Sequence, residues 1–360
     1  MENGEAGKKG KLDRYFYVMM LLLFGLTILS AVYSVSIGQV NIPFKQSMDI
    51  VLHMITNGKL GSLDSVQSNS YLNIIMQVRM PRVIFAFLVG IGLALCGVVM
   101  QAIVQNPLAD PYILGISSGA TLGATFAILV GFGSSAFLAQ FGVAFGAFAG
   151  ATITSFAVFL MASIGGKLTS IKLILSGVVI GALCGSFSSL IIYFANSAEG
   201  IQTVTFWTMG SLASSNWSKV PIMAVVIILG CVIFLFQHRI LNTMLLGDES
   251  AITLGINLSA FRKIYMILTS LITGTLVAYT GMIGFVGLVV PHITRGIFGA
   301  DHKRLLPGTL LFGGLFMIWA DIISRVLIHN VELPIGIVTS VIGSPVFIYI
   351  IVKRGYNFGG

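Results

Sequence analysis

Long apolar runs recur along the chain, and they constrain its fold more than any other feature. A helix needs about 20 mainly apolar residues to cross a bilayer, and the sequence offers ten such stretches. They are 15–37, 83–104, 112–132, 136–161, 173–195, 219–237, 262–281, 284–298, 307–328 and 334–352. The eighth is short and contains Pro291, so we expect it to be tilted or broken. The sequence predicts an all-α polytopic membrane protein with ten transmembrane helices.

Composition supports this class. Of the 360 residues, 56% are hydrophobic and only 9% are charged, whereas soluble domains carry about 25% charged residues. We divide the chain into a polar tail (1–14), one membrane domain (15–354) and a C-terminal tail (355–360). The run after the first tail is too long for a signal-peptide core, so we expect it to remain as an anchor. The segment 201–216 is too polar to cross and is typical of a short interfacial helix.

The distribution of positive charge predicts the orientation. If the N-terminus is inside and the spans alternate, fourteen of the twenty lysines and arginines fall on the inner side. The six outer ones are Lys45, Lys59, Arg79, Arg82, Lys219 and Arg325. Because positive charge favours the cytoplasmic side, we expect both termini to be cytoplasmic. The formal net charge of +8 reflects this bias, and no nucleic-acid motif accompanies it.

Glycine recurs at every fourth position in three of the spans. The positions are Gly115, Gly119 and Gly123; Gly142, Gly146 and Gly150; and Gly177, Gly181 and Gly185. Glycines at this spacing form a smooth groove on one helix face, which lets a second helix approach closely. We interpret them as helix-packing positions, and by themselves they indicate no substrate.

Few residues offer catalytic or proton-relay chemistry. Asp321 is the acidic residue well within a predicted span, and Arg325 four residues later could neutralise it on the same helix face. The segment 161–170 resembles a phosphate loop, but Met161 and Leu168 occupy two essential positions. We predict no catalytic residue, no metal site and no cofactor bound by this chain, and we interpret its three cysteines as packing residues.

Several segments together resemble the permease subunit of FecCD-type (type II) ABC importers for iron-siderophores, haem and cobalamin. They are RMPR (79–82), GVVMQAIVQNPLADPYILGISSGATLGA (97–124), LGDESAITLGIN (246–257), GFVGLVVPHITRGIFGADHKRLLPG (284–308), WADIISR (319–325) and ELPIGIVTSVIGSPVFIYII (332–351). The resemblance runs from about residue 15 to 354, and the order of the segments makes it specific.

The resemblance implies the type II importer permease fold, with ten helices and cytoplasmic termini in a bacterial or archaeal cell membrane. It also implies partners. A second permease copy or a paralogue would complete the pathway, and two ATPase subunits on the cytoplasmic face would bind ATP–Mg. A substrate-binding lipoprotein or periplasmic protein would deliver substrate to the outer face.

The resemblance assigns roles to residues. Arg79, Arg82 and Arg325 would dock acidic residues of the substrate-binding protein. The alternative from the residues alone is that Arg79 and Arg82 anchor a helix end among headgroups and that Arg325 only neutralises Asp321. From the residues alone, the amphipathic segment 245–257 could lie on the membrane surface or dock into a partner's groove. The resemblance assigns coupling to the ATPase to this cytoplasmic segment. The coupling residues would be Gly247, Asp248, Glu249, Leu254 and Gly255, and the inner gate residues would be Asn106, Leu108, Thr169 and Ser170.

The sequence leaves the substrate open. Family frequency ranks a ferric siderophore above haem and haem above cobalamin. A secondary transporter driven by an ion gradient is the first alternative, and it requires essential ionisable residues within the spans. An intramembrane enzyme is the second, and no convincing catalytic pair supports it.

Overall fold

The computed structural model describes residues 2–63, 68–131, 136–165 and 169–354. Across these residues the chain is helical, with one isolated β-bridge between Ile328 and Val331. In chain order the elements are α1 (Glu2–Ser36), α2 (Phe44–Ile55), α3 (Asn69–Asn73), the π-helix η1 (Ile74–Arg79), α4 (Met80–Val104), the 3-10 helix η2 (Pro111–Leu114), α5 (Ile116–Leu129), α6 (Ala136–Ser163), α7 (Ser170–Phe194), α8 (Ala198–Thr208), α9 (Val220–Phe236), α10 (His238–Leu245), α11 (Asp248–Thr253), α12 (Leu258–Thr280), α13 (Val286–Phe298), α14 (His302–Val326) and α15 (Ile335–Arg354).

Each predicted span contains a helix, but the ten-span count is not confirmed. Six helices of the described residues are long and apolar enough to cross a membrane, and the bent pair α9 and α10 raises the number to seven. Helices α5 and α13 are shorter, at 10–17 residues, and so is the apolar stretch Ile335–Tyr349 of α15. The eighth predicted span corresponds to α13, which has 13 residues and contains Pro291.

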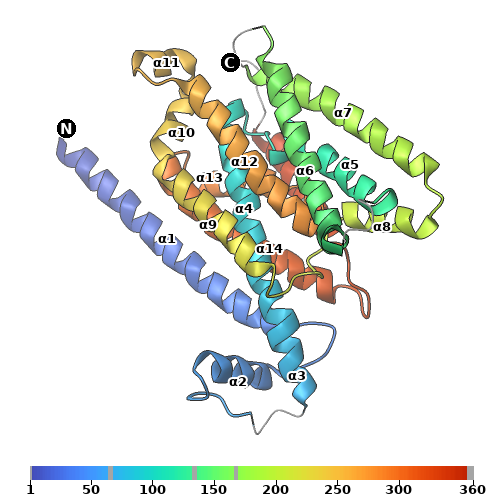
Figure 1. The fold of residues 1–360 in the computed structure, drawn as a ribbon. Coiled ribbons are helices and arrows are strands. Elements are labelled where there is room, and N and C mark those ends of the chain that lie inside the picture. Colours follow the sequence, from blue (N-terminus) through green and yellow to red (C-terminus); the bar gives the residue numbers. More distant parts are fainter. Residues whose placement is uncertain (1, 64–67, 132–135, 166–168, 355–360) are drawn as a thin grey trace.

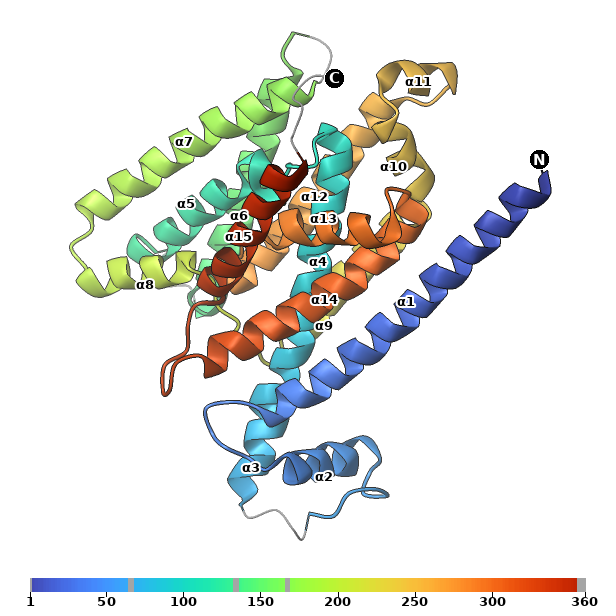
Figure 2. The same cartoon turned by 180° about the vertical axis from the view of Figure 1, so that it is seen from behind.

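The two ends of the bundle differ. The N-terminus of α1, the C-terminus of α15 and the small helix α11 lie at one end, called here the α11 end (Figure 1). The helices α2 and α3 lie at the other, the α2 end, as the reverse view also shows (Figure 2). Which end faces the cytoplasm stays a prediction.

Helix α4 forms the centre of the bundle. It continues α3 and η1 as one apolar segment from residue 69 to 104, and 83% of its most apolar window is buried. Helices α9, α12, α13 and α14 all contact it. Two glycines let neighbouring helices pack closely against α4. A side chain on Gly90 would collide with the Gly313 carbonyl of α14, and one on Gly97 with the Gly287 carbonyl of α13.

Peripheral helices expose apolar side chains instead. In α1, Leu21 and Leu29 are 70% and 68% exposed, and only 22% of the span's most apolar window is buried. Such large apolar surfaces are stable against lipid or a partner rather than against water. They agree with a multi-pass membrane protein.

Candidate functional site

A buried charge cluster occupies the α2 end, where α1, α4 and α14 meet. The carboxylate of Asp321 on α14 is completely buried, and two guanidinium groups contact it. Arg82 Nε lies 2.8 Å from one carboxylate oxygen, and Arg325 Nε lies 3.0 Å from the other. The Asp321–Arg325 pair predicted from their spacing is therefore present, and it includes a second arginine.

Glu332, in the segment between α14 and α15, completes the coordination of Arg82. The two terminal nitrogens of Arg82 donate to the two Glu332 oxygens at 2.9 and 2.6 Å. Such a bidentate contact fixes both position and orientation. Arg82 therefore ties α4 to α14 and to the segment that follows α14.

Arg79 and Arg325 bind the C-terminal end of α1. Arg79 donates to the carbonyl oxygens of Val35 at 3.0 Å and of Ser36 at 2.8 Å, and also to that of Val40. Arg325 donates to the Ser34 hydroxyl at 2.7 Å. The last carbonyls of a helix have no partner within it, and cations stabilise this end. These arginines supply that function for α1.

The docking role expected of Arg79, Arg82 and Arg325 stays a prediction. The three residues are only 4–6% exposed. The side chains of Arg82 and Arg325 are 7% and 6% exposed, and that of Arg79 is bonded to main-chain oxygens inside the protein. The sequence reasoning did not identify Glu332 or Ser34 as partners. Its only signal was an acidic residue shortly before Pro334 at a predicted outer span end.

The proposed coupling segment projects from the α11 end (Figure 1). Gly247 and Gly255 flank α11 with positive φ angles of 91° and 71°, which glycine adopts without strain. Leu254 is 61% exposed, whereas Ala251 is buried and fixes the turn to the bundle. The side chains of Asp248 and Glu249 lie outside the described residues. The geometry provides a small exposed helix, and its partner stays a prediction.

Asn106 and Leu108, two of the four expected gate residues, lie in the turn after α4. Gln105 ends the helix in the left-handed conformation, with φ of 54°. The Asn106 side chain then accepts a hydrogen bond from the Leu108 N–H at 2.9 Å. Asp110 accepts one from the Tyr112 N–H at 2.8 Å, which begins η2. Local side-chain bonds of this kind hold the turn rigid.

Thr169 and Ser170, the other pair, begin α7. The Thr169 hydroxyl accepts a hydrogen bond from the Lys172 N–H at 3.3 Å and so caps the helix. Helix α7 contacts the η2 turn, because Gly177 lies against the Ile113 carbonyl. The two expected gate segments are thus connected through η2, and a gating role for them stays a prediction.

Some glycines of the three predicted series contact a neighbouring helix closely, and others do not. A side chain on Gly119 would collide with Thr154 and one on Gly123 with the Gly146 carbonyl, and Gly150 lies equally close to Gly119. These contacts bring α5 and α6 together. Gly115 ends η2 with φ of 69°. Gly181 has only the Ser118 side chain nearby, Gly185 has no neighbouring atom within 4 Å, and Gly142 is buried.

Two hollows open among the helices, and the larger lies toward the α2 end (Figure 1). The larger, of about 830 Å³, lies between α6, α8 and the start of α9. The smaller, of about 470 Å³, is lined by Tyr112 and Ser117 with residues of α15 such as Ser340.

No group of three or more histidine, cysteine or acidic side chains that could hold a metal occurs in the described parts of the chain.

Comparison with known proteins places these features in a family. The model of the FecCD transport family matches residues 26–353. The uncharacterized ABC transporter permease protein YvrB of Bacillus subtilis (strain 168) is 37% identical over 338 residues, with 94% of each chain covered. The hemin transport system permease protein HmuU of Yersinia pestis is 35% identical, with 78% of this chain and 83% of the relative covered.

The structure has a close match as well. A solved ABC transporter assigned to the metal-chelate type, in an inward-facing conformation, superposes with a TM-score of 0.77. It is 33% identical in sequence, and the alignment covers 93% of this chain and 99% of that one. The similarity therefore extends over nearly the whole molecule.

Proposed function

This chain belongs to the FecCD transport family of ABC permeases, and from that premise we propose that it carries an iron chelate across the cytoplasmic membrane. The observation that supports this most is the whole-length structural similarity to a transporter of the metal-chelate type. A ferric siderophore ranks first as substrate, then haem, which HmuU's name gives for that relative, then cobalamin.

The energy source in this proposal is a separate ATPase. The exposed helix α11 would seat in a groove of that subunit, and two ATPase subunits would serve two permease copies, or one copy and a paralogue. ATP-driven closure would then rock the helices around a shared pathway. A substrate-binding protein would load the opposite end.

The lining of the hollows favours a chelate over a bare metal ion. A bare ferric ion would need several hard oxygen ligands, and the described residues bring no such carboxylate group together. Asp321 does not supply a proton relay either, because Arg82 and Arg325 neutralise it. This pairing weakens the alternative of an ion-gradient-driven transporter.

Reconstituted vesicles test the proposal. The permease, its cognate ATPase and its binding protein are placed in liposomes with ATP–Mg inside, and uptake of an ⁵⁵Fe-labelled ferric siderophore is measured. Uptake should require both ATP and the ATPase, and haem and cobalamin should be poorer substrates. Uptake that continues without the ATPase in an imposed ion gradient would favour the secondary transporter.

A further inference from the structure

The larger hollow is lined by parts of five elements, which contribute charged, aromatic and apolar side chains. Ile128 of α5 and Val143 of α6 form apolar wall, as does Ile222 at the start of α9. Trp207 of α8 and Tyr279 of α12 add aromatic surface. A volume of about 830 Å³ is within the range of small-molecule sites.

Lys219 supplies positive charge to this hollow without an acidic partner. Its ammonium donates to the Ser214 carbonyl oxygen at 2.7 Å, which uses one of its three hydrogens. Within the described residues, no carboxylate forms a salt bridge with it. Lys219 immediately precedes α9, and burial lowers the pKa of its ammonium group. Burial removes water from the ammonium group and so disfavours its charged form. A bound anion beside the ammonium would stabilise that charge again.

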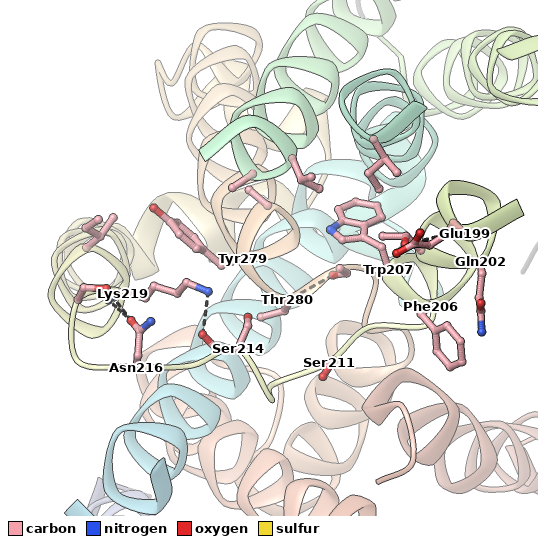
Figure 3. Close-up of a pocket in the computed structure, with 18 residues that line it drawn as sticks. Glu199, Gln202, Phe206, Trp207, Ser211, Ser214, Asn216, Lys219, Tyr279 and Thr280 are labelled. Atoms are coloured by element: carbon pink, nitrogen blue, oxygen red, sulfur yellow. Dashed lines mark hydrogen bonds between the residues drawn. The ribbon is translucent and has the colours of Figure 1, made fainter. Parts of the chain in front are cut away.

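A second donor faces Lys219. Figure 3 shows the Lys219 ammonium and the indole nitrogen of Trp207 on opposite sides of the hollow, each directed toward the space between them. In the part of the chain that the structure describes, the Trp207 N–H donates to no acceptor. The half-buried Trp207 side chain can therefore donate this hydrogen to a molecule in the hollow. Two donors that converge on one space form a site for a negatively charged group.

The acidic residue that lines the hollow, Glu199, lies away from Lys219 (Figure 3). Glu199, in the first turn of α8, is on the far side of the Trp207 ring from Lys219 (Figure 3). The positive helix N-terminus stabilises its charge there. A ligand must therefore present its anionic group on the Lys219 side and keep negative charge away from Glu199.

We propose that this hollow binds the carboxylate, phosphate or sulfonate group of a partly apolar molecule between Lys219 and Trp207. The apolar body of the ligand lies against Ile222, Val143 and the aromatic rings. The site is separate from the hollow lined by α15, because the two share no lining residue. The inference does not depend on the transport function proposed above.

Energy transfer from Trp207 to a fluorescent probe tests the site. The full chain is placed in phosphatidylcholine nanodiscs with Trp217→Phe and Trp319→Phe, so that Trp207 is the one donor. Each of these changes removes one hydrogen bond, from Trp217 to Met76 and from Trp319 to Ser30, so unfolding of the background protein is checked first. The probes are anilinonaphthalene sulfonate and the uncharged N-phenylnaphthylamine, which differ by the anionic group.

The charge variants separate an anion site from general apolar binding. Lys219→Met should weaken binding of the sulfonate probe about tenfold, because a charge-assisted contact is lost, and leave the uncharged probe unchanged. Lys219→Arg should retain binding. Glu199→Gln should leave or increase the affinity for the sulfonate. Lys45→Met, at an exposed lysine of the same end, is the matched control and should have no effect.

The proposal is overturned if Lys219→Met changes neither probe or weakens both equally. Phosphatidylglycerol added to the nanodiscs identifies the natural source. If it displaces the sulfonate probe, the site takes an anionic lipid headgroup; if it does not, the site takes a soluble acidic molecule. Both results require that Lys219→Met selectively weakens binding of the sulfonate, so each supports the anion site.

Discussion

Arg82 Nε on α4 lies 2.8 Å from the Asp321 carboxylate on α14, although 239 positions separate the two residues in the chain. Both side chains are buried, and Arg325 and Glu332 contact the same pair. Buried charges are stable only when paired, and removal of one partner costs more than the pair contributes. The integrity of the α2 end therefore depends on Asp321.

Asp321→Asn should destabilise the protein strongly. It leaves the buried guanidinium groups of Arg82 and Arg325 without their shared carboxylate, at a cost of about 3–5 kcal/mol in the free energy of unfolding. Glu332→Gln is the control, because that side chain is 32% exposed, and a loss of about 1 kcal/mol is expected. Thermal unfolding in detergent measures both. Equal midpoints for the two variants would contradict the assignment.

The docking role of Arg82 has a separate test. Reversal of all three arginine charges would disrupt the buried cluster, so a loss of transport would not distinguish docking from folding. Glu332→Gln instead removes the competing negative charge and leaves one of the two terminal nitrogens of Arg82 without its acceptor. If acidic residues of a substrate-binding protein dock there, its affinity should rise several-fold in surface-plasmon binding. An unchanged affinity would assign Arg82 to structure alone.

The glycine contacts predict a sharp contrast between two alanine variants. Gly123→Ala places a methyl group against the Gly146 carbonyl of α6, and overpacking of this kind costs about 1–3 kcal/mol. Gly185→Ala meets no atom within 4 Å and should change the stability of the monomer by less than about 1 kcal/mol. Unfolding midpoints in detergent compare them. A neutral Gly123→Ala would show that α5 and α6 can separate freely.

Leu254 should contribute to ATPase binding if α11 is the coupling element. Leu254→Asp places a charge on a 61% exposed apolar position and should reduce co-purification of the ATPase about tenfold or more. Leu60→Asp is the matched control, since Leu60 is 58% exposed and lies at the α2 end. Equal retention of the ATPase by both variants would exclude α11 from the interface.

Stability should depend on the ionisation of Asp110. Burial raises the pKa of its carboxyl group from about 3.8 to about 6, although the Tyr112 N–H partly opposes the shift. The folded protein thus binds a proton more tightly, and stability present below pH 3.8 is lost as the pH rises through 6. Asp110→Asn keeps a cap acceptor without the charge. Its unfolding midpoint should exceed that of the native protein at pH 7.5 and match it near pH 4.

Much of the helical architecture follows from the sequence because apolar runs and caps act locally. The bounds are less accurate where a local signal competes with another. The ninth predicted span begins at residue 307, whereas α14 begins at His302, where the Asp301 side chain accepts a hydrogen bond from the Lys303 N–H. The Asp301 cap determines the start of α14, and Pro307 lies inside the helix without ending it.

Only part of the charge cluster could be predicted from the sequence. The Asp321–Arg325 pair follows from a four-residue spacing, which is a property of one helix. The contacts of Arg82 with Glu332 and of Arg79 with Val35 join segments 250 and 44 positions apart. No periodicity encodes such a pairing, because it depends on how α1, α4 and α14 pack. The anion site has the same origin, since Lys219 and Trp207 face each other only in the folded chain.

The backbone contacts of α4 limit how the protein can change shape. Gly90 touches α14 and Gly97 touches α13 through carbonyl groups, with no flexible side chain between them. We therefore expect these three helices to move together, and α5 to move with α6 for the same reason. Helix α12 contacts both α4 and α6, so it spans the seam between the two groups. We therefore expect a conformational change that moves the two groups relative to each other to bend, slide or roll along α12.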